Sequence, residues 1–176
     1  MSDTTQSQIK ALEWLRLYRS LTQKPINELT TPQKILLKEL ELKISQFLDP
    51  NNAAQNPKRD HLRVNTSLEV QLQDISFKNE DLFRKAYIKN ISGGGLFIET
   101  NELPSMGAHV KFKLSIEHPP QSLELGGRVT WLNPVPSTVA PKGFGLKFDD
   151  MDDEDRRMIL GIVNTEAKKL VKKKKK

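Results

Sequence analysis

The chain has 176 residues, no cysteine, and 28 Lys and Arg against 22 Asp and Glu, which gives a formal net charge of +6. This length fits one domain of ordinary size with a small addition, and the absence of cysteine excludes a disulfide scaffold, a Cys-ligated metal site and a Cys nucleophile. Three scattered histidines (His61, His109 and His118) form no metal-binding pattern, so we expect neither a metal site nor a cofactor.

Much of the positive charge is concentrated at the C-terminus. The run Lys172–Lys176 carries five positive charges, and the rest of the chain is close to neutral. Such a tail attracts an anionic membrane leaflet, binds nucleic acid non-specifically or stays solvated, and the sequence does not choose among these roles. We therefore expect at most transient membrane contact by the tail and no specific nucleic-acid partner.

Residues 1–50 are predicted to form a helical hairpin. Within residues 6–22, apolar side chains recur every three or four positions, as in a helix with one buried face. These side chains are Ala11, Trp14, Leu15, Tyr18 and Leu21. The dipeptide Lys24-Pro25 ends the pattern, because the residue before a proline is biased away from the helical conformation.

A second helix is predicted from Thr30 to about Asp49-Pro50. Gln33, three residues after Thr30, can reach back to the N-cap, and a proline between them suits the first turn. The apolar stripe of this helix consists of Leu37, Leu40, Ile44 and Phe47. Since Ile35 and Leu42 lie off that stripe, we expect the helix to bury two faces.

Two helices of this length cannot bury both of their stripes on each other alone. Three arrangements stay open: packing on the following domain, packing on a second copy in a homodimer, or docking to an unidentified protein partner. A polar linker rich in Pro and Asn, residues 51–58, separates the hairpin from the rest of the chain.

From residue 59 the hydrophobic period changes from that of a helix to that of a strand. Alternating or short apolar runs lie within residues 64–72, 86–88, 96–98, 110–116, 123–132 and 144–148. About six short strands separated by turn signals predict a mainly β fold, either a sandwich or a small barrel.

A final helix is predicted after the last strand. Acidic residues (Asp152, Asp153, Glu154 and Asp155) occupy its first turn, where the helix dipole favours anions. We expect one domain, residues 59–165, to hold the strands and most of this helix, with the helix end and the poly-Lys tail in residues 166–176. With no secretory signal and no long apolar segment in the sequence, we expect a cytoplasmic protein.

Two short motifs carry recognisable chemistry. Arg59 and Arg63 form an RxxxR pattern between the linker and the first predicted strand, and residues 90–95 read Asn-Ile-Ser-Gly-Gly-Gly, which fits (D/N)xSxxG. The segments Gly-Arg-Val-Thr-Trp at residues 127–131 and Gly-Phe-Gly-Leu-Lys-Phe at 143–148 follow in order.

Together these segments resemble the PilZ domain, the bacterial receptor module for the second messenger cyclic di-GMP. The resemblance covers roughly residues 57–165 and leaves out the N-terminal helices. It implies a six-stranded antiparallel β-barrel with a C-terminal helix, here preceded by the N-terminal αα-hairpin, which agrees with the number of strands read from the pattern.

The resemblance also implies the ligand-binding residues. Arg59 and Arg63 would contact phosphate and guanine, with Lys58 as a further phosphate contact, because a guanidinium offers a rigid fork of donors and a flat stacking surface. The motif residues of the turn would be Asn90, Ser92 and Gly95, while Gly93 and Gly94 add conformational freedom without an assigned role.

Two further residues have open assignments. Arg128 points either at the ligand or at solvent, and Trp131 is either a packing residue or a base-stacking platform, with packing favoured. We assign no catalytic residue, because no metalloprotease, phosphate-loop or Ser-His-Asp pattern is present.

The resemblance therefore implies a non-enzymatic signal-transduction receptor. Binding of cyclic di-GMP would change its conformation or partner contacts and so control motility, surface behaviour or biofilm formation. The alternatives are a PilZ-fold scaffold that does not bind nucleotide, and a binder of nucleic acid or membrane surfaces that acts through the Lys tail.

Overall fold

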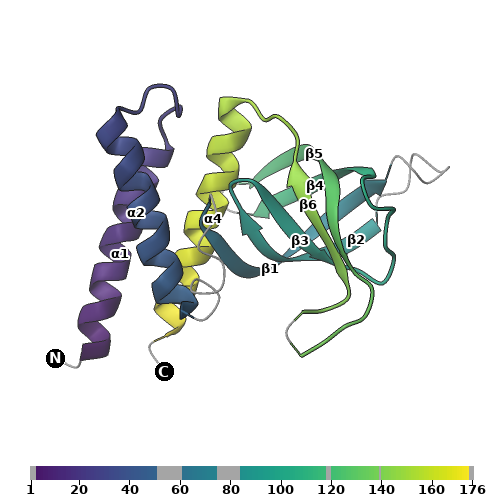
Figure 1. Cartoon of the computed structure of the whole chain (residues 1–176), viewed down its shortest axis with the longest axis horizontal. Helices are drawn as coiled ribbons and strands as arrows, with labels where there is room; N and C mark the ends of the chain where they lie inside the picture. The colour runs from purple at the N-terminus through teal and green to yellow at the C-terminus, as the bar shows by residue number, and fades with distance from the viewer. Residues whose placement is uncertain (1–2, 51–60, 75–83, 118–119, 139, 175–176) are drawn as a thin grey trace. The chain divides into compact units, whose positions relative to one another are not determined.

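The structure is a computed structural model that describes residues 3–50, 61–74, 84–117, 120–138 and 140–174 (Figure 1). The linker predicted at 51–58 lies outside the described residues. The chain divides into two compact units, one formed by residues 1–65 with 153–176 and the other by residues 66–152. By its contacts, the final helix groups with residues 1–65.

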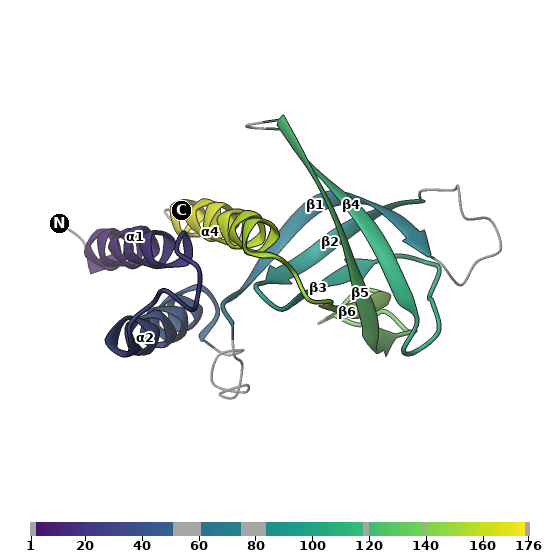
Figure 2. The same cartoon turned by 90° about the horizontal axis from the view of Figure 1, so that it is seen from above.

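The helical unit consists of α1 (Asp3–Thr22), α2 (Thr31–Leu48) and α4 (Asp153–Lys173). Helix α1 packs against both other helices, and Figure 2 shows α1 and α4 side by side. The buried apolar side chains of the three helices are Ala11, Leu15, Tyr18, Leu21, Leu40, Ile44, Ile159, Ile162, Val163, Ala167 and Val171. The predicted stripe of α1 is therefore confirmed, except that Trp14 is only half-buried.

Local contacts fix the ends of these helices. At the start of α2 the backbone N–H of Thr30 donates to Oε1 of Gln33 at 3.0 Å, as the capping pattern predicts. At the end of α4 the Lys174 ammonium donates to the backbone carbonyl of Phe47 and lies 4.9 Å from the centre of the Phe47 ring. This lysine therefore places a positive charge against the carbonyl end of α2, where the helix dipole favours a cation.

The prediction that α2 buries two faces is wrong for the single chain. Ile35 is 57% exposed and Leu42 is 51% exposed, whereas Leu40 and Ile44 are buried. The reason is that α2 has one main neighbour, α1, and makes few contacts with α4.

The second unit is a closed barrel of six strands in the order β1-β2-β3-β6-β5-β4. The strands are β1 (Arg63–Asp74), β2 (Arg84–Ser92), β3 (Gly95–Glu99), β4 (His109–Glu117), β5 (Pro120–Asn133) and β6 (Gly143–Phe148). The described pairings are antiparallel, so the predicted six-stranded antiparallel barrel with its N-terminal helices and C-terminal helix is confirmed.

Alternate residues of the strands fill the barrel. Leu96 and Ile98 of β3 and Phe144 of β6 are buried, and Phe112 of β4 packs against Phe148 of β6 with ring centres 5.8 Å apart. Because the side-chain period of a strand is two, the intervening residues of β3 and β6 face outward. None of the helices in the described ranges is long and apolar enough to cross a membrane.

Two glycines allow β3 and β6 to pair closely. A Cβ atom at Gly143 would lie 2.0 Å from the carbonyl oxygen of Ile98, and one at Gly95 would lie 2.2 Å from the carbonyl oxygen of Leu146. Both distances are far below a van der Waals contact, so a larger residue at either position forces the two backbones apart.

We expect Gly143→Ala to lower the free energy of unfolding by about 2 kcal/mol or more, because overpacking against backbone cannot relax by a side-chain rotation. Gly161 in α4 supplies the matched control, since a Cβ there meets nothing within 4 Å. Gly161→Ala should raise the free energy of unfolding by about 0.5–1 kcal/mol through helix propensity. Urea unfolding of both variants measures the difference, and equal effects would contradict the role given to Gly143.

The most buried ionisable group of the helical unit is the Tyr18 hydroxyl. It has no hydrogen-bond partner of acceptable geometry among the described residues. Burial raises the pKa of Tyr18 well above its usual range, and the nearby Glu41 carboxylate adds to the rise. The unfolded chain therefore releases this proton at a lower pH than the folded protein does.

Stability should consequently fall above about pH 10, by up to about 1.4 kcal/mol per pH unit, because the unfolded state then binds fewer protons than the folded state. Tyr18→Phe should remove this part of the pH dependence. Tyr87, which is 48% exposed, is the other tyrosine of the chain, and Tyr87→Phe is the control. Urea unfolding between neutral and alkaline pH checks this. A slope unchanged by Tyr18→Phe would contradict the assignment.

Candidate functional site

The predicted Asn-x-Ser-x-x-Gly motif forms the end of β2, a two-residue turn and the start of β3. Ser92 pairs with Gly95 across this hairpin, and Gly93 and Gly94 form the turn between them. The Ser92 hydroxyl is buried and donates to the carbonyl oxygen of Gly95 at 3.0 Å. Ser92 therefore holds the turn closed.

The glycines of the motif have a structural role that the sequence did not predict. Among the described residues, the positive φ falls on Gly107, at 79°, and not within the Gly93–Gly94 turn. Gly95 is instead required by the close approach of β3 to β6. The motif thus needs glycine at position 95 for strand pairing, whatever it binds.

A β-bulge at Lys89 sets the direction of Asn90. Ile88 pairs with Ile98 and Asn90 pairs with Phe97, so Lys89 is the extra residue of β2. Because a bulge shifts the alternation by one residue, Asn90 lies on the outer face of the barrel, as Phe97 does. The Lys89 ammonium forms an ion pair with Glu99 at 2.6 Å, which fixes the bulge to the neighbouring strand.

Strand register places Asn90 in a row of four residues. Asn90 lies opposite Phe97, Phe97 opposite Gly145, and Gly145 opposite Trp131, so the row crosses β2, β3, β6 and β5. A second bulge in β5, between Val129 and Trp131, turns the Trp131 side chain outward in the same way as Lys89 turns Asn90.

Glycine at position 145 lets the two aromatic rings of this row meet. A Cβ at Gly145 would lie 3.4 Å from the Cβ of Trp131, and the Phe97 and Trp131 ring centres are 5.2 Å apart. Phe97 is buried under this contact, whereas Trp131 remains 49% exposed. Trp131 is therefore a packing residue on one side and an open indole surface on the other.

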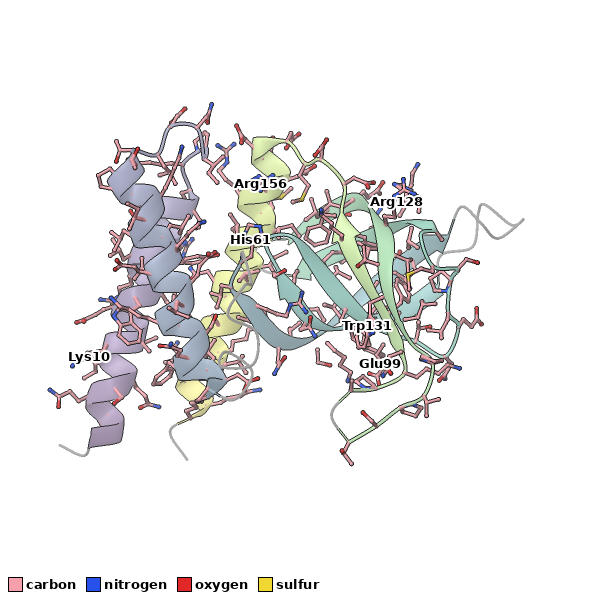
Figure 3. The ribbon with its side chains drawn as sticks, viewed as in Figure 1. Lys10, His61, Glu99, Arg128, Trp131 and Arg156 are labelled. Carbon is pink, nitrogen blue, oxygen red and sulfur yellow. The ribbon has the colours of Figure 1, made fainter. Side chains whose placement is uncertain are left out.

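A second row runs parallel to the first. Ser92 lies opposite Gly95, Gly95 opposite Lys147, and Lys147 opposite Arg128. Lys147 and Arg128 are exposed, and the Arg128 guanidinium donates to the carbonyl oxygen of Gly107 at 3.0 Å (Figure 3). Two cations thus stand beside the turn, one of them held in place by a backbone carbonyl.

We call the two rows together the glycine face. It consists of Asn90, Ser92, Gly95, Phe97, Arg128, Trp131, Gly145 and Lys147. Gly95 and Gly145 carry no side chain on this face: Gly95 allows the close approach of β6, and Gly145 makes room for the Trp131 side chain. The Asn90 Oδ1 atom is buried and has no hydrogen-bond partner among the described residues, which leaves one acceptor unused at the edge of this face.

The structure brings together only part of the predicted site. Asn90, Ser92, Gly95 and Arg128 share the glycine face, and the Gly93–Gly94 turn borders it. Arg63 is exposed at the first residue of β1, in the part of the chain assigned to the helical unit. Lys58 and Arg59 lie outside the described residues.

Three residues of the glycine face, Phe97, Gly145 and Lys147, were not predicted from the sequence. Lys147 and Phe97 each stand between inward-facing apolar neighbours, and strict alternation within β6 and β3 would have placed both outward. Within the described residues, no group of three or more His, Cys, Asp or Glu side chains is placed to hold a metal ion.

Comparison with known families identifies the barrel. The profile of the PilZ domain matches residues 57–164, more than half of the chain. The chain belongs to the PilZ domain family. A comparison with curated proteins found no match.

A solved PilZ domain shares this fold at low sequence identity. The PilZ domain of YcgR from Escherichia coli with c-di-GMP has a TM-score of 0.51 and 11% identity, over 66% of this chain and 96% of that chain. The Bacillus subtilis inhibitor of motility MotI/DgrA has a TM-score of 0.49 and 16% identity, over 60% of this chain. This chain spans about half (49%) of the length of the MotI/DgrA chain.

Stability measurements can distinguish Ser92, which holds the turn through a hydrogen bond, from Asn90, whose acceptor has no partner among the described residues. Ser92→Ala should lower the free energy of unfolding by about 1 kcal/mol, because it removes the buried hydrogen bond to Gly95. Asn90→Ala should leave it unchanged or raise it, because the Asn90 acceptor has no partner to lose. Urea unfolding of the two variants tests this, and a larger loss for Asn90→Ala would show that Asn90 serves the fold.

Proposed function

We propose that this protein is a non-enzymatic receptor that binds cyclic di-GMP on the glycine face of its barrel. The observation that carries the proposal is the unused acceptor of Asn90, which shares the outer face of the sheet with an aromatic pair and two cations. A purine dinucleotide has complementary features: anionic phosphates, flat bases and base-edge donors.

The chemistry of each part of the face fits one part of the ligand. The Asn90 amide can hydrogen-bond to a guanine edge, and the exposed side of Trp131 offers a surface on which a base can stack, an interaction worth about 1–3 kcal/mol per base. The cations of Lys147 and Arg128 attract phosphate, which they meet with the ammonium and guanidinium donors typical of phosphate sites.

Arg59 and Arg63 complete the proposed site. A guanidinium pairs bidentately with phosphate or with the O6 and N7 atoms of guanine, and it stacks on a base plane, so two of them can hold both ends of a small dinucleotide. Support comes from family membership, from the intact RxxxR and Asn-x-Ser-x-x-Gly patterns, and from the fold shared with a PilZ domain whose structure carries c-di-GMP.

The output of binding is a change of protein contacts. The RxxxR segment lies between the helices of residues 1–50 and the barrel strands in sequence, so a ligand held by Arg59 and Arg63 alters how the helical unit is presented to a protein partner. Ligand-driven reordering of a charged segment is a general route to switching. We propose that the affected process is motility, surface behaviour or biofilm formation in a bacterial cytoplasm.

Isothermal titration with cyclic di-GMP tests the receptor. The wild-type protein should bind, and Arg59→Ala and Arg63→Ala should each weaken binding by about 30-fold or more, because removing one partner of a hydrogen-bonded charge pair costs about 2 kcal/mol or more. Arg63→Lys should restore only part of the affinity, since lysine keeps the charge and loses the fork.

Arg157→Ala removes one positive charge at an exposed position of α4, as the two test variants do elsewhere, and should leave the affinity for cyclic di-GMP unaltered. Asn90→Ala should weaken binding by about fivefold or more without loss of stability, which separates ligand contact from folding. Absence of binding by the wild type at tens of micromolar cyclic di-GMP would overturn the proposal and favour a PilZ-fold scaffold that does not take the nucleotide.

A further inference from the structure

A cluster of positive charge lies on the helical unit, outside the barrel and its glycine face. Arg16 and Arg19 are exposed on α1, and Lys168 and Lys172 lie on α4. The two helices pack together, with the buried Gln8 amide of α1 donating to the backbone carbonyl of Val171 in α4 at 3.2 Å. We call the cluster of Arg16, Arg19, Lys168 and Lys172 the basic face.

The four charges act on one another. None of the ion pairs within the described ranges of the chain includes a residue of the basic face. Partial burial lowers the pKa of Lys168, and the positive charges of Arg19, Arg16 and Lys172 lower it further, in that order. Like charges gathered in this way repel, so an anion placed against the face relieves an unfavourable interaction.

Neighbouring charges do not cancel the cluster. On α1 the exposed Glu13 is accompanied by the basic Lys10, Arg16 and Arg19. On α4 the Glu166 carboxylate pairs with Lys169, which is not part of the basic face, at 2.6 Å. The five-lysine run from Lys172 to Lys176 extends the positive charge along the sequence beyond the described part of α4.

Exposed aliphatic side chains on α1 indicate which class of anionic partner the basic face binds. Ile9 is 46% exposed and Leu17 is 43% exposed, and both lie on the side of α1 opposite its buried stripe. Helical periodicity puts Arg16 on the same stripe as Ile9, two turns further along α1, whereas Leu17 is turned about 100° from Arg16. The described large exposed aromatics, Tyr87 and Trp131, belong to the barrel, so the basic face offers no platform for stacking nucleic-acid bases.

We infer that the basic face, together with Ile9, is a docking surface for an anionic lipid membrane. Lysine and arginine near an anionic leaflet are each attracted to it, and exposed aliphatic side chains beside them enter the headgroup region. The membrane-contacting part of the chain then consists of a folded surface on two helices in addition to the poly-Lys tail. This inference is independent of cyclic di-GMP binding.

Vesicle binding of the full chain tests the inference. The wild type should sediment with phosphatidylglycerol-containing vesicles and not with phosphatidylcholine vesicles, and added salt should weaken the binding. The triple variant Arg16→Gln, Arg19→Gln and Lys168→Gln should bind about 100-fold more weakly, because each charge near an anionic surface is worth about fivefold. Its circular dichroism should match that of the wild type.

The matched control removes three charges elsewhere on the helical unit. Lys24→Gln, Lys34→Gln and Lys38→Gln together change the net charge equally, at exposed positions on α2 and on the turn before it. This control should lose no more than about fivefold. Equal losses in the two triple variants, or no vesicle binding by the wild type, would overturn the inference, because the attraction would then be diffuse or absent.

A second pair of measurements separates a membrane from nucleic acid. Ile9→Ser should weaken binding to anionic vesicles and leave binding to a short DNA duplex unaltered, since a bilayer accepts an aliphatic side chain and a duplex does not. Tighter binding to the duplex than to anionic vesicles, with the same dependence on Arg16 and Arg19, would assign the basic face to a nucleic acid and overturn the lipid assignment.

Discussion

The close pairing of β3 with β6 is the constraint on which both the barrel and its proposed ligand face depend. Gly95 and Gly143 stand near opposite ends of this ladder, where any side chain would collide with a carbonyl group of the partner strand. The ladder joins strands that are not consecutive in the chain, so it completes the closed barrel. The same ladder carries Gly145 in its middle, where the absence of a side chain lets the Phe97 and Trp131 rings meet.

Much of the architecture follows from local sequence patterns. Alternation of apolar residues gives the strands of the barrel, and the spacing of Leu40 and Ile44, with Gln33 as a cap, gives α2. These features are predictable because a strand or an amphipathic helix is determined by neighbours within a few residues. The order of motifs then indicates the PilZ family before any three-dimensional information enters.

Other features depend on tertiary contacts that no local pattern encodes. The bulges at Lys89 and before Trp131 reverse which residues face outward, so the outward position of Asn90 required the register of four strands. Similarly, α4 has the amphipathic pattern of a helix that could cover any apolar surface, and only its contacts with α1 assign it to the helical unit. The exposure of Ile35 reflects the number of neighbours α2 has, which its own sequence does not set.

The motif residues divide into those that shape the turn and those that are left to meet a ligand. Ser92 and Gly95 are already engaged, the first through its hydrogen bond and the second through strand pairing. Asn90 has an acceptor without a partner in the described structure, and Trp131 has an open side. Asn90 and Trp131 are therefore among the barrel groups that the proposal assigns to the nucleotide.

Tryptophan fluorescence gives the most direct test of the glycine face as the ligand site. The chain has two tryptophans, so Trp14→Phe leaves Trp131 as the sole emitter and Trp131→Phe leaves Trp14 on α1. Titration with cyclic di-GMP should quench Trp131 saturably, at the concentrations where calorimetry detects binding, because a guanine then stacks on the exposed indole, and it should leave Trp14 emission nearly unchanged. Calorimetric binding with no change in Trp131 emission would contradict the account and place the ligand elsewhere.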